Sequence, residues 1–235
     1  MRNLIKAGLV ALGLCVAAHV AAGPFEDGVA AADRGDYASA LRLWRPLADQ
    51  GHAEAQLFLG LMYENGQGVP QDYTEAVKWY RKAADQGSAD AQFNLGLMYA
   101  KGQGVPQDYA AAVTWFRKAA DQGNDQAQSN LGFIYSHGRG VPQDYIEAVK
   151  WYRKAADQGY AGAQFNLGLM YENGQGVPQD YVQAHQWFNL AAARYRASET
   201  EHRKVAITNR DRVASKMTPA QVAEAQRLAR EWKPQ

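Results

Sequence analysis

A repeat of 36 residues runs through most of this 235-residue chain. Glycines that each follow Asp-Gln recur at that spacing, at Gly51, Gly87, Gly123 and Gly159. The pattern Gly-x-Gly-Val-Pro-Gln-Asp-Tyr recurs with the same period, at 66–73, 102–109, 138–145 and 174–181. Self-similarity at a period of about 20–50 residues is typical of solenoids, in which each unit buries its apolar face against its neighbours. The chain is therefore predicted to fold as a stack of similar units.

Each unit has the pattern of two helices. The first, such as 91–101, places Ala91, Leu95 and Met98 at helical spacing. A glycine occupies the middle of this helix, where it costs about 1 kcal/mol relative to alanine. We expect the paired helix to approach closely at these glycines, which are Gly60, Gly96, Gly132 and Gly168. The second helix is predicted to begin at an N-cap aspartate, namely Asp72, Asp108, Asp144 and Asp180, and to end at the glycine that follows Asp-Gln.

The repeat divides the chain into segments. Four full units are predicted at 52–87, 88–123, 124–159 and 160–193. Residues 23–51 form a degenerate N-terminal capping unit, which lacks the Gly-x-Gly-Val-Pro loop, because terminal repeats of a solenoid are commonly atypical. Residues 194–235 fall outside the period and are predicted to form C-terminal capping helices, the last of which opens with a capping box at Thr218.

The repeat resembles the Sel-one-like repeat (SLR) family, a branch of the tetratricopeptide-like helical repeats. The matching segments are Ala-Gln-Phe-Asn-Leu-Gly-Leu-Met-Tyr at 91–99, Gly-Gln-Gly-Val-Pro-Gln-Asp-Tyr at 102–109 and Ala-Val-x-Trp-Phe-Arg-Lys-Ala-Ala at 112–120. The resemblance implies an all-α, right-handed α-solenoid of antiparallel helix pairs. It also implies a protein–protein adaptor, since many family members are exported bacterial proteins of envelope assembly, signalling or host contact. A cysteine-rich branch includes proteins named β-lactamases, but no repeat here contains cysteine, so that label is not carried over.

The N-terminus has the pattern of a secretory signal peptide. Arg2 and Lys6 precede an uncharged apolar run at 7–18, and Val20-Ala21-Ala22 supplies small residues for cleavage before Gly23. The alternative is an uncleaved N-terminal anchor. The run is too short for a stable transmembrane helix, and no second apolar run of about 20 residues follows. We therefore expect a signal peptide at 1–22 and a periplasmic protein, with secretion as the alternative. Cleavage would also remove Cys15, the only cysteine, which suits an oxidising compartment.

Catalytic, metal and cofactor sites are not predicted. The histidines of the mature chain recur at no fixed position of the repeat, and the Gly-x-Gly loops follow helices, whereas phosphate-binding loops follow strands. Turn chemistry explains these loops, and helix capping explains the recurring aspartates. The recurring aromatic residues could form a ligand-stacking ladder, but their helical spacing favours a place in the core; they are Tyr63, Tyr99, Tyr135, Tyr171, Trp79, Trp115, Trp151 and Trp187.

The concave face is the predicted partner-binding surface, because first helices line it in tetratricopeptide-like solenoids. Asparagines recur on this helix and could hydrogen-bond an extended peptide, while residues one turn on could adapt to apolar side chains. The candidate residues are Phe58, Met62, Asn94, Met98, Asn130, Ile134, Asn166 and Met170. The alternative is that the asparagines bond between neighbouring helices and only stabilise the stack.

Charge is unevenly distributed. Residues 23–193 hold 13 basic and 19 acidic side chains, whereas 194–235 hold 10 basic and 5 acidic ones. The formal net charge of the whole chain is +1, which argues against a nucleic-acid partner. The basic tail could contact an anionic partner or membrane surface, present a solvated helix face, or complement the acidic repeats of the same molecule. Its candidate residues are Arg194, Arg196, Arg203, Lys204, Arg210 and Arg212.

These observations together predict a non-enzymatic periplasmic or secreted repeat protein. It would act as a scaffold, adaptor or regulator that binds another protein or peptide, whose identity the sequence does not define. One alternative is an envelope enzyme, either peptidoglycan-active or β-lactamase-like. The other is a secreted factor that binds a host protein.

Overall fold

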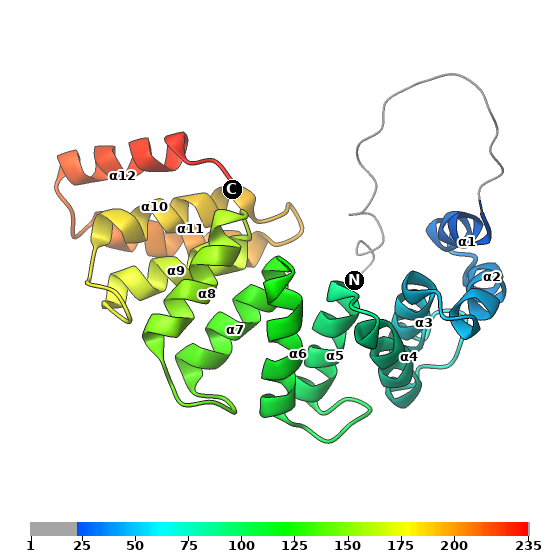
Figure 1. The fold of residues 1–235 in the computed structure, drawn as a ribbon. Coiled ribbons are helices and arrows are strands. Elements are labelled where there is room, and N and C mark those ends of the chain that lie inside the picture. The colour runs from blue at the N-terminus through cyan, green and yellow to red at the C-terminus, as the bar shows by residue number, and fades with distance from the viewer. Residues whose placement is uncertain (1–22, 235) are drawn as a thin grey trace. The chain divides into compact units, whose positions relative to one another are not determined.

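The computed structural model describes residues 23–234 of the chain (Figure 1). Over this range the chain forms twelve α-helices and no strand, which confirms the predicted all-α class. The chain divides into two compact units, one ending at Gln107 and the other beginning at Asp108. The predicted signal peptide, 1–22, lies outside the described residues. None of the helices between residues 23 and 234 is long and apolar enough to cross a membrane.

The first unit is built from consecutive helices that pack against each other in chain order. They are α1 (Pro24–Asp33), α2 (Tyr37–Asp49), α3 (Ala53–Asn65), α4 (Tyr73–Asp85) and α5 (Ala89–Lys101). The pair α1–α2 lies in the segment predicted as a degenerate unit, and α3–α4 lies in the segment predicted as the first full repeat. The core of α1–α3 gathers around Trp44, which is 1% exposed and whose indole N–H donates to the carbonyl of Phe25.

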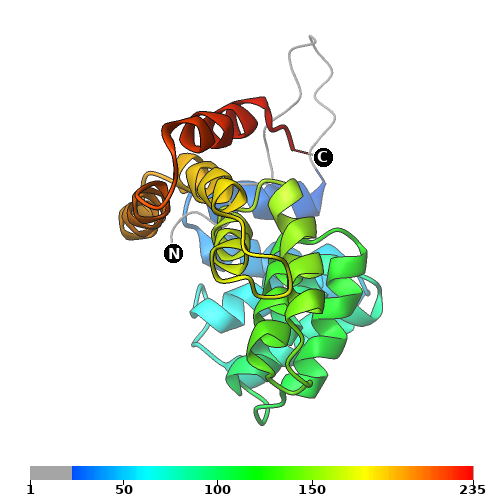
Figure 2. The same ribbon diagram turned by 90° about the vertical axis from the view of Figure 1, so that its left-hand side faces the viewer.

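The second unit continues the same alternation and ends in two further helices. Its elements are α6 (Tyr109–Asp121), α7 (Asp125–His137), α8 (Tyr145–Asp157), α9 (Ala161–Asn173), α10 (Tyr181–Arg194), α11 (Thr200–Ala214) and α12 (Pro219–Glu231). Each helix from α6 to α10 packs against the next, and both α11 and α12 pack against α10. Figure 2 shows α11 and α12, in orange and red, against the yellow α10. The helices of the tail beyond the repeats thus pack on the last repeat.

The helix ends follow the predicted local chemistry. The carboxylate of Asp72 accepts hydrogen bonds from the backbone N–H groups of Thr74 and Glu75, at 2.9 and 3.0 Å. The other three predicted aspartates cap α6, α8 and α10 in the same way. After the second helix α4, Gly87 adopts φ +96°, which confirms the predicted left-handed residue. The loop glycines Gly138 and Gly140 are also left-handed, with φ of 65° and 69°.

The mid-helix glycines are sites of close helix approach, as the sequence predicts. A Cβ atom on Gly132 would lie 2.6 Å from Cδ1 of Tyr152 on the paired helix. At Gly168 it would lie 2.7 Å from Cε1 of Phe188. Real Cβ atoms do not approach carbon atoms so closely, since the optimal separation is about 3.5–4.0 Å. The absence of a side chain at Gly60, Gly132 and Gly168 thus allows α4, α8 and α10 to place an aromatic ring directly on the preceding first helix.

Buried glutamines connect each first helix to the second helix before it. Gln128 is 5% exposed, and its side-chain amide donates to the carbonyl of Ala120 at 3.1 Å. Its amide oxygen accepts from Gln158 at 2.8 Å. The same bond to the preceding helix occurs at Gln56, Gln92 and Gln164. A buried amide that finds its partners in this way fixes the register between successive repeats.

Candidate partner-binding surface

The predicted asparagines are half-buried on the first helices. Asn94 lies on α5 of the first unit, whereas Asn130 and Asn166 lie on α7 and α9 of the second. The side-chain amide of Asn130 donates to the carbonyl of Gln126, one turn back on its own helix, at 2.8 Å. Within residues 23–234 none of the three bonds to a neighbouring helix, a role that the buried glutamines fill instead. Binding by these asparagines therefore stays a prediction, while their alternative role between helices is not seen.

The residues one turn on from the asparagines require a correction. Met62, Met98, Ile134 and Met170 are between 0% and 7% exposed, so they belong to the core. They cannot contact a partner in the folded state, contrary to the expectation that they adapt to apolar side chains. The reason is that the buried stripe of the first helix runs through positions such as Ala91, Leu95 and Met98. Phe58 is half-buried and stacks on Trp44, with ring centroids 4.7 Å apart.

Apolar side chains that the sequence reasoning did not select accompany the asparagines. Phe93 and Leu97 on α5 are half-buried, and Phe133 on α7 holds the position equivalent to Leu97. Their spacing of four residues was the available signal, since it places Phe93 and Leu97 on one face. In the last repeat the equivalent Phe165 and Leu169 pack partly against the core that α10 and α11 share. The cap thus covers part of this row in the second unit.

The recurring aromatic residues are structural. Trp79, Trp151 and Trp187 are 3–4% exposed, as expected for core residues. The Arg117 guanidinium lies 5.4 Å from the ring centroid of Trp151 and donates to the Tyr135 hydroxyl at 2.6 Å. On the same ring, Lys154 lies at 4.2 Å. Equivalent contacts join Arg45 to Tyr63 and Trp79, and Arg153 to Tyr171 and Trp187. Cations of successive second helices thus lie over these rings, which favours a structural role for them.

The Gly-x-Gly loops serve turns and contacts between repeats. A Cβ atom on Gly140 would lie 2.8 Å from the backbone carbonyl carbon of Tyr109, at the start of α6. The Gln143 side chain, from the same loop, donates to the carbonyl of Ser136 at 2.8 Å and so closes the end of α7. The turn chemistry predicted from the sequence accounts for Gly138 and Gly140, the two glycines of this loop.

The histidines occupy four unlike environments. His52 caps α3, His137 packs on Phe133 with ring centroids 4.1 Å apart, and His202 stacks on Tyr195. His185 is buried, with 3% exposure, and burial lowers the pKa of its imidazole, with a further contribution from Arg210. Over residues 23–234, no three His, Cys, Asp or Glu side chains come together to hold a metal ion.

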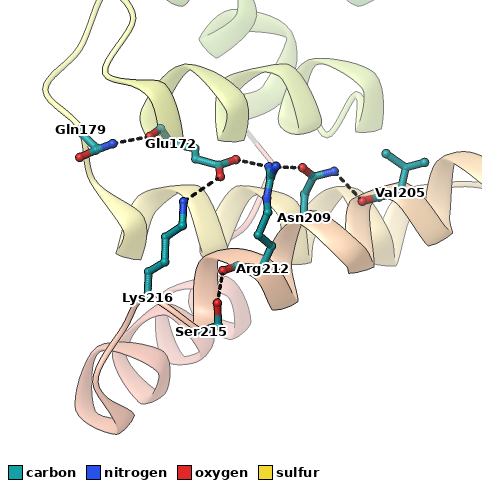
Figure 3. A network of polar contacts seen from close by, with 7 residues as sticks. All are labelled: Glu172, Gln179, Val205, Asn209, Arg212, Ser215 and Lys216. Carbon is teal, nitrogen blue, oxygen red and sulfur yellow. Dashed lines mark hydrogen bonds and ion pairs between the residues drawn. The ribbon is translucent and has the colours of Figure 1, made fainter.

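Some basic side chains of the tail form ion pairs within the molecule. The Glu172 side chain on α9 is 6% exposed, and its carboxylate pairs with Arg212 of α11 at 2.6 Å and with Lys216 at 3.7 Å (Figure 3). Figure 3 also shows that Asn209 contacts the Arg212 guanidinium from one turn back on α11. The Arg194 guanidinium lies 4.2 Å from the ring centroid of Trp232. The two ion pairs with Glu172 support the interpretation that the tail complements the repeats of the same molecule.

The comparisons with known proteins agree with this architecture. The Sel1 repeat model matches the chain five times, at 17–52, 53–88, 89–124, 125–160 and 161–194. A solved protein described as a protective antigen of uropathogenic Escherichia coli strains with an SLR fold is 36% identical, with a TM-score of 0.79. That match covers 89% of this chain and 44% of the E. coli chain. This chain therefore spans less than half of that protein.

A Sel1 repeat protein from Oxalobacter formigenes is similar over most of its own length. It is 31% identical with a TM-score of 0.69, and the match covers 86% of this chain and 84% of that one. No curated protein matches the chain. The first of the five model matches overlaps the unit predicted as degenerate, which α1 and α2 form.

Proposed function

Because the chain belongs to the Sel1 repeat family, whose members are typically protein-interaction scaffolds, we propose that it is a non-enzymatic scaffold or adaptor. It binds a protein or peptide on the half-exposed face of its first helices. The observation that carries this proposal is that asparagines recur at one position of the first helices, once in the first unit and twice in the second. Among the described residues they make no interhelical bond, and half-buried apolar side chains lie beside them. Surfaces of mixed apolar and amide character are well suited to peptides.

The chemistry of this face matches an extended chain. An asparagine side chain offers two donors and an acceptor, which a peptide backbone can satisfy with its own C=O and N–H groups. Phe93 and Leu97 in the first unit, and Phe133 in the second, would bury apolar side chains of the partner. Burial of apolar surface contributes about 25 cal/mol per Å², so a few such contacts would supply most of the affinity for the peptide. Hydrogen bonds to the asparagine amides would set the position of the peptide along the helices.

Site-specific photocrosslinking in the producing cell tests the location of the face. A photoreactive residue is placed at Asn94 or Asn166 on first helices, and at Lys78 or Lys150 on second helices as matched controls. Both lysine side chains are well exposed, at 60% and 64%. We expect the asparagine positions to capture one common partner and the lysine positions to capture none. Equal capture at all four positions contradicts the proposal.

A triple substitution tests the asparagines themselves. Asn94→Ala, Asn130→Ala and Asn166→Ala together should abolish capture from a photoreactive residue at Leu97 while leaving the thermal unfolding midpoint unchanged. Undiminished capture refutes their role in binding. A lowered midpoint with undiminished capture assigns them to the stability of the stack instead.

We further propose that the protein is exported to the periplasm. The signal-like segment at 1–22 supports this, as does the description of the similar E. coli protein as a protective antigen. Intact-mass analysis of the periplasmic fraction should find a mature chain that begins at Gly23. Recovery of uncleaved protein from the cytoplasm contradicts export, and recovery from the medium indicates secretion.

The proposal of a non-enzymatic protein has its own test. Purified mature protein should not turn over a chromogenic β-lactam or peptidoglycan above the buffer control. Robust turnover that one point substitution abolishes overturns the scaffold proposal in favour of an envelope enzyme.

A further inference from the structure

A cavity of about 380 Å³ lies where the last repeat meets the cap, among α10, α11 and α12. Its polar lining comes from all three helices: His185, Asn189, Arg210, Asp211, Gln226 and Arg230. Ala214 and Val222 supply apolar lining. Small-molecule sites commonly measure about 300–1,000 Å³ and combine apolar walls with a few convergent polar groups. This cavity falls in that size range, its lining is mostly polar, and none of the three asparagines lines it.

The last repeat departs from the others at two of these positions. His185 stands where the earlier repeats have Val77, Val113 and Val149. Asn189 stands where they have Arg81, Arg117 and Arg153, which cover aromatic rings of the repeat that follows. A valine at 185 would seal the contact with the cap by apolar packing, as Val149 does in its own repeat at 7% exposure. The imidazole and the amide give the cavity a polar wall instead.

The imidazole is left without a partner. His185 is 3% exposed, and within the described chain its Nδ1 atom is buried without a hydrogen bond. A buried polar group that stays unsatisfied costs about 1–3 kcal/mol, so such groups call for a specific explanation. Arg210 and Asp211 of α11 and Arg230 of α12 line the same cavity as the imidazole. Burial and then Arg210 lower the pKa of the imidazole, whereas Asp211 raises it, and the net effect favours the neutral form, which has one donor and one acceptor nitrogen.

The cavity carries a net positive charge. Arg210 is held by Asp211 at 2.7 Å and donates to the Asn189 side-chain oxygen at 3.3 Å. Arg230 makes no hydrogen bond or ion pair within residues 23–234, so its guanidinium is available. Two guanidinium groups and one carboxylate leave one unit of positive charge for a ligand. A guanidinium binds a carboxylate through two parallel hydrogen bonds, whereas a doubly charged anion would be repelled by Asp211.

We propose that this cavity is a binding site for a monocarboxylate with a short apolar body. Arg230 pairs with the carboxylate, Arg210 adds a second positive charge, and the neutral imidazole of His185 supplies a hydrogen bond. Val222 and Ala214 contact the apolar part. Two sources share this chemistry, a free small carboxylate and the C-terminal residue of a peptide. Occupancy would join α10 to both cap helices.

NMR titration of the mature protein tests the site, with the His185 imidazole and the methyl groups of Ala214 and Val222 as reporters. The probes are butyrate, trialanine with a free C-terminus, the same tripeptide amidated, and inorganic phosphate. We expect saturable shifts with butyrate or free trialanine at millimolar concentration, and none with the amide. Butyrate alone indicates a small-molecule site, and free trialanine alone indicates a peptide terminus. The proposal is overturned if neither butyrate nor free trialanine gives saturable shifts. It is also overturned if phosphate binds more tightly than these two probes.

Two variants separate the site from general charge. Arg230→Gln should weaken binding at least about tenfold, whereas Arg227→Gln should leave it unchanged. Arg227 is on the same helix but pairs with Glu224 and Glu231. His185→Val, which restores the residue of the other repeats, should weaken binding without lowering the unfolding midpoint. Equal loss in Arg230→Gln and Arg227→Gln would mean nonspecific attraction and refute the assigned site.

Discussion

Replacement of Gly132 by alanine should destabilise the protein, although alanine is the better helix former. Gly132 lies in the interior of α7, where alanine would gain about 1 kcal/mol of helix propensity. The added Cβ would, however, lie 2.6–2.8 Å from three ring atoms of Tyr152. That ring is 2% exposed, and side chains in a close-packed core resist displacement. The steric term should therefore exceed the propensity term.

The size of the effect follows from these two terms. Extra methyl groups in a packed core typically cost about 1–3 kcal/mol. The added methyl group would contact three ring atoms, one of them Cγ at the base of the ring, so the steric cost of Gly132→Ala should lie at the upper end of that range. With about 1 kcal/mol of propensity subtracted, the net loss is about 1–2 kcal/mol. At about 2–4 °C per kcal/mol for a chain of this size, the midpoint should fall by about 2–8 °C.

Thermal unfolding followed by circular dichroism measures this shift. The matched background is Tyr152→Leu, which removes the ring. In that background Gly132→Ala should become neutral or stabilising, so the two substitutions should couple by at least about 1 kcal/mol. A rise in the midpoint of Gly132→Ala alone, or the same loss with and without the ring, would refute the steric argument.

Three further changes test the packing between repeats and the cap. Gln128→Ala removes two hydrogen bonds, the one to the Ala120 carbonyl and the one accepted from Gln158. At about 0.5–1.5 kcal/mol for each bond, it should lower the free energy of unfolding by about 1–3 kcal/mol, measured by urea denaturation. Arg212→Ala removes the main partner of buried Glu172 and should increase hydrogen exchange in α11 and α12, whereas Lys204→Ala, at a pair exposed to solvent, should not. Burial raises the pKa of Tyr152 to about 12. In the unfolded chain the Tyr152 hydroxyl has its ordinary pKa of about 10, so it loses its proton at a lower pH than in the folded chain. The free energy of unfolding should therefore fall as pH rises from about 10 to 12, by up to about 3 kcal/mol. Tyr152→Phe should reduce that fall in urea titrations across this range.

Local chemistry made much of this fold predictable. Helix starts depend on a side chain two or three residues from the groups it caps, so Asp72 and its equivalents could be assigned from spacing alone. Gly132 and Gly168 were predictable for a similar reason, because glycine inside a helix is unfavourable unless another helix comes close. The last helix was predicted from its capping box, which the structure contains at Thr218 and Gln221.

The exposed face of the first helix was harder to predict. A first helix in a repeat stack is buried against its own partner and against the neighbouring repeats, so apolar residues occupy most of its circumference. Periodicity therefore did not separate buried Met98 from half-exposed Leu97, one residue away. The cavity at His185 could not be predicted from the sequence, because its walls come from three helices. Sequence alone does not fix how α12 lies across α10.

The cap has a consequence for assembly. Trp232 packs edge-on to Trp187, with ring centroids 6.4 Å apart, and Ala206, Val213 and Ala225 of the two cap helices are fully buried. These side chains cover an end of the repeat array that would otherwise be apolar. A bare end of this kind can accept another copy by head-to-tail contact, and such contacts do not close on themselves. We therefore expect the cap helices, α11 and α12, to prevent head-to-tail association of the array through this end.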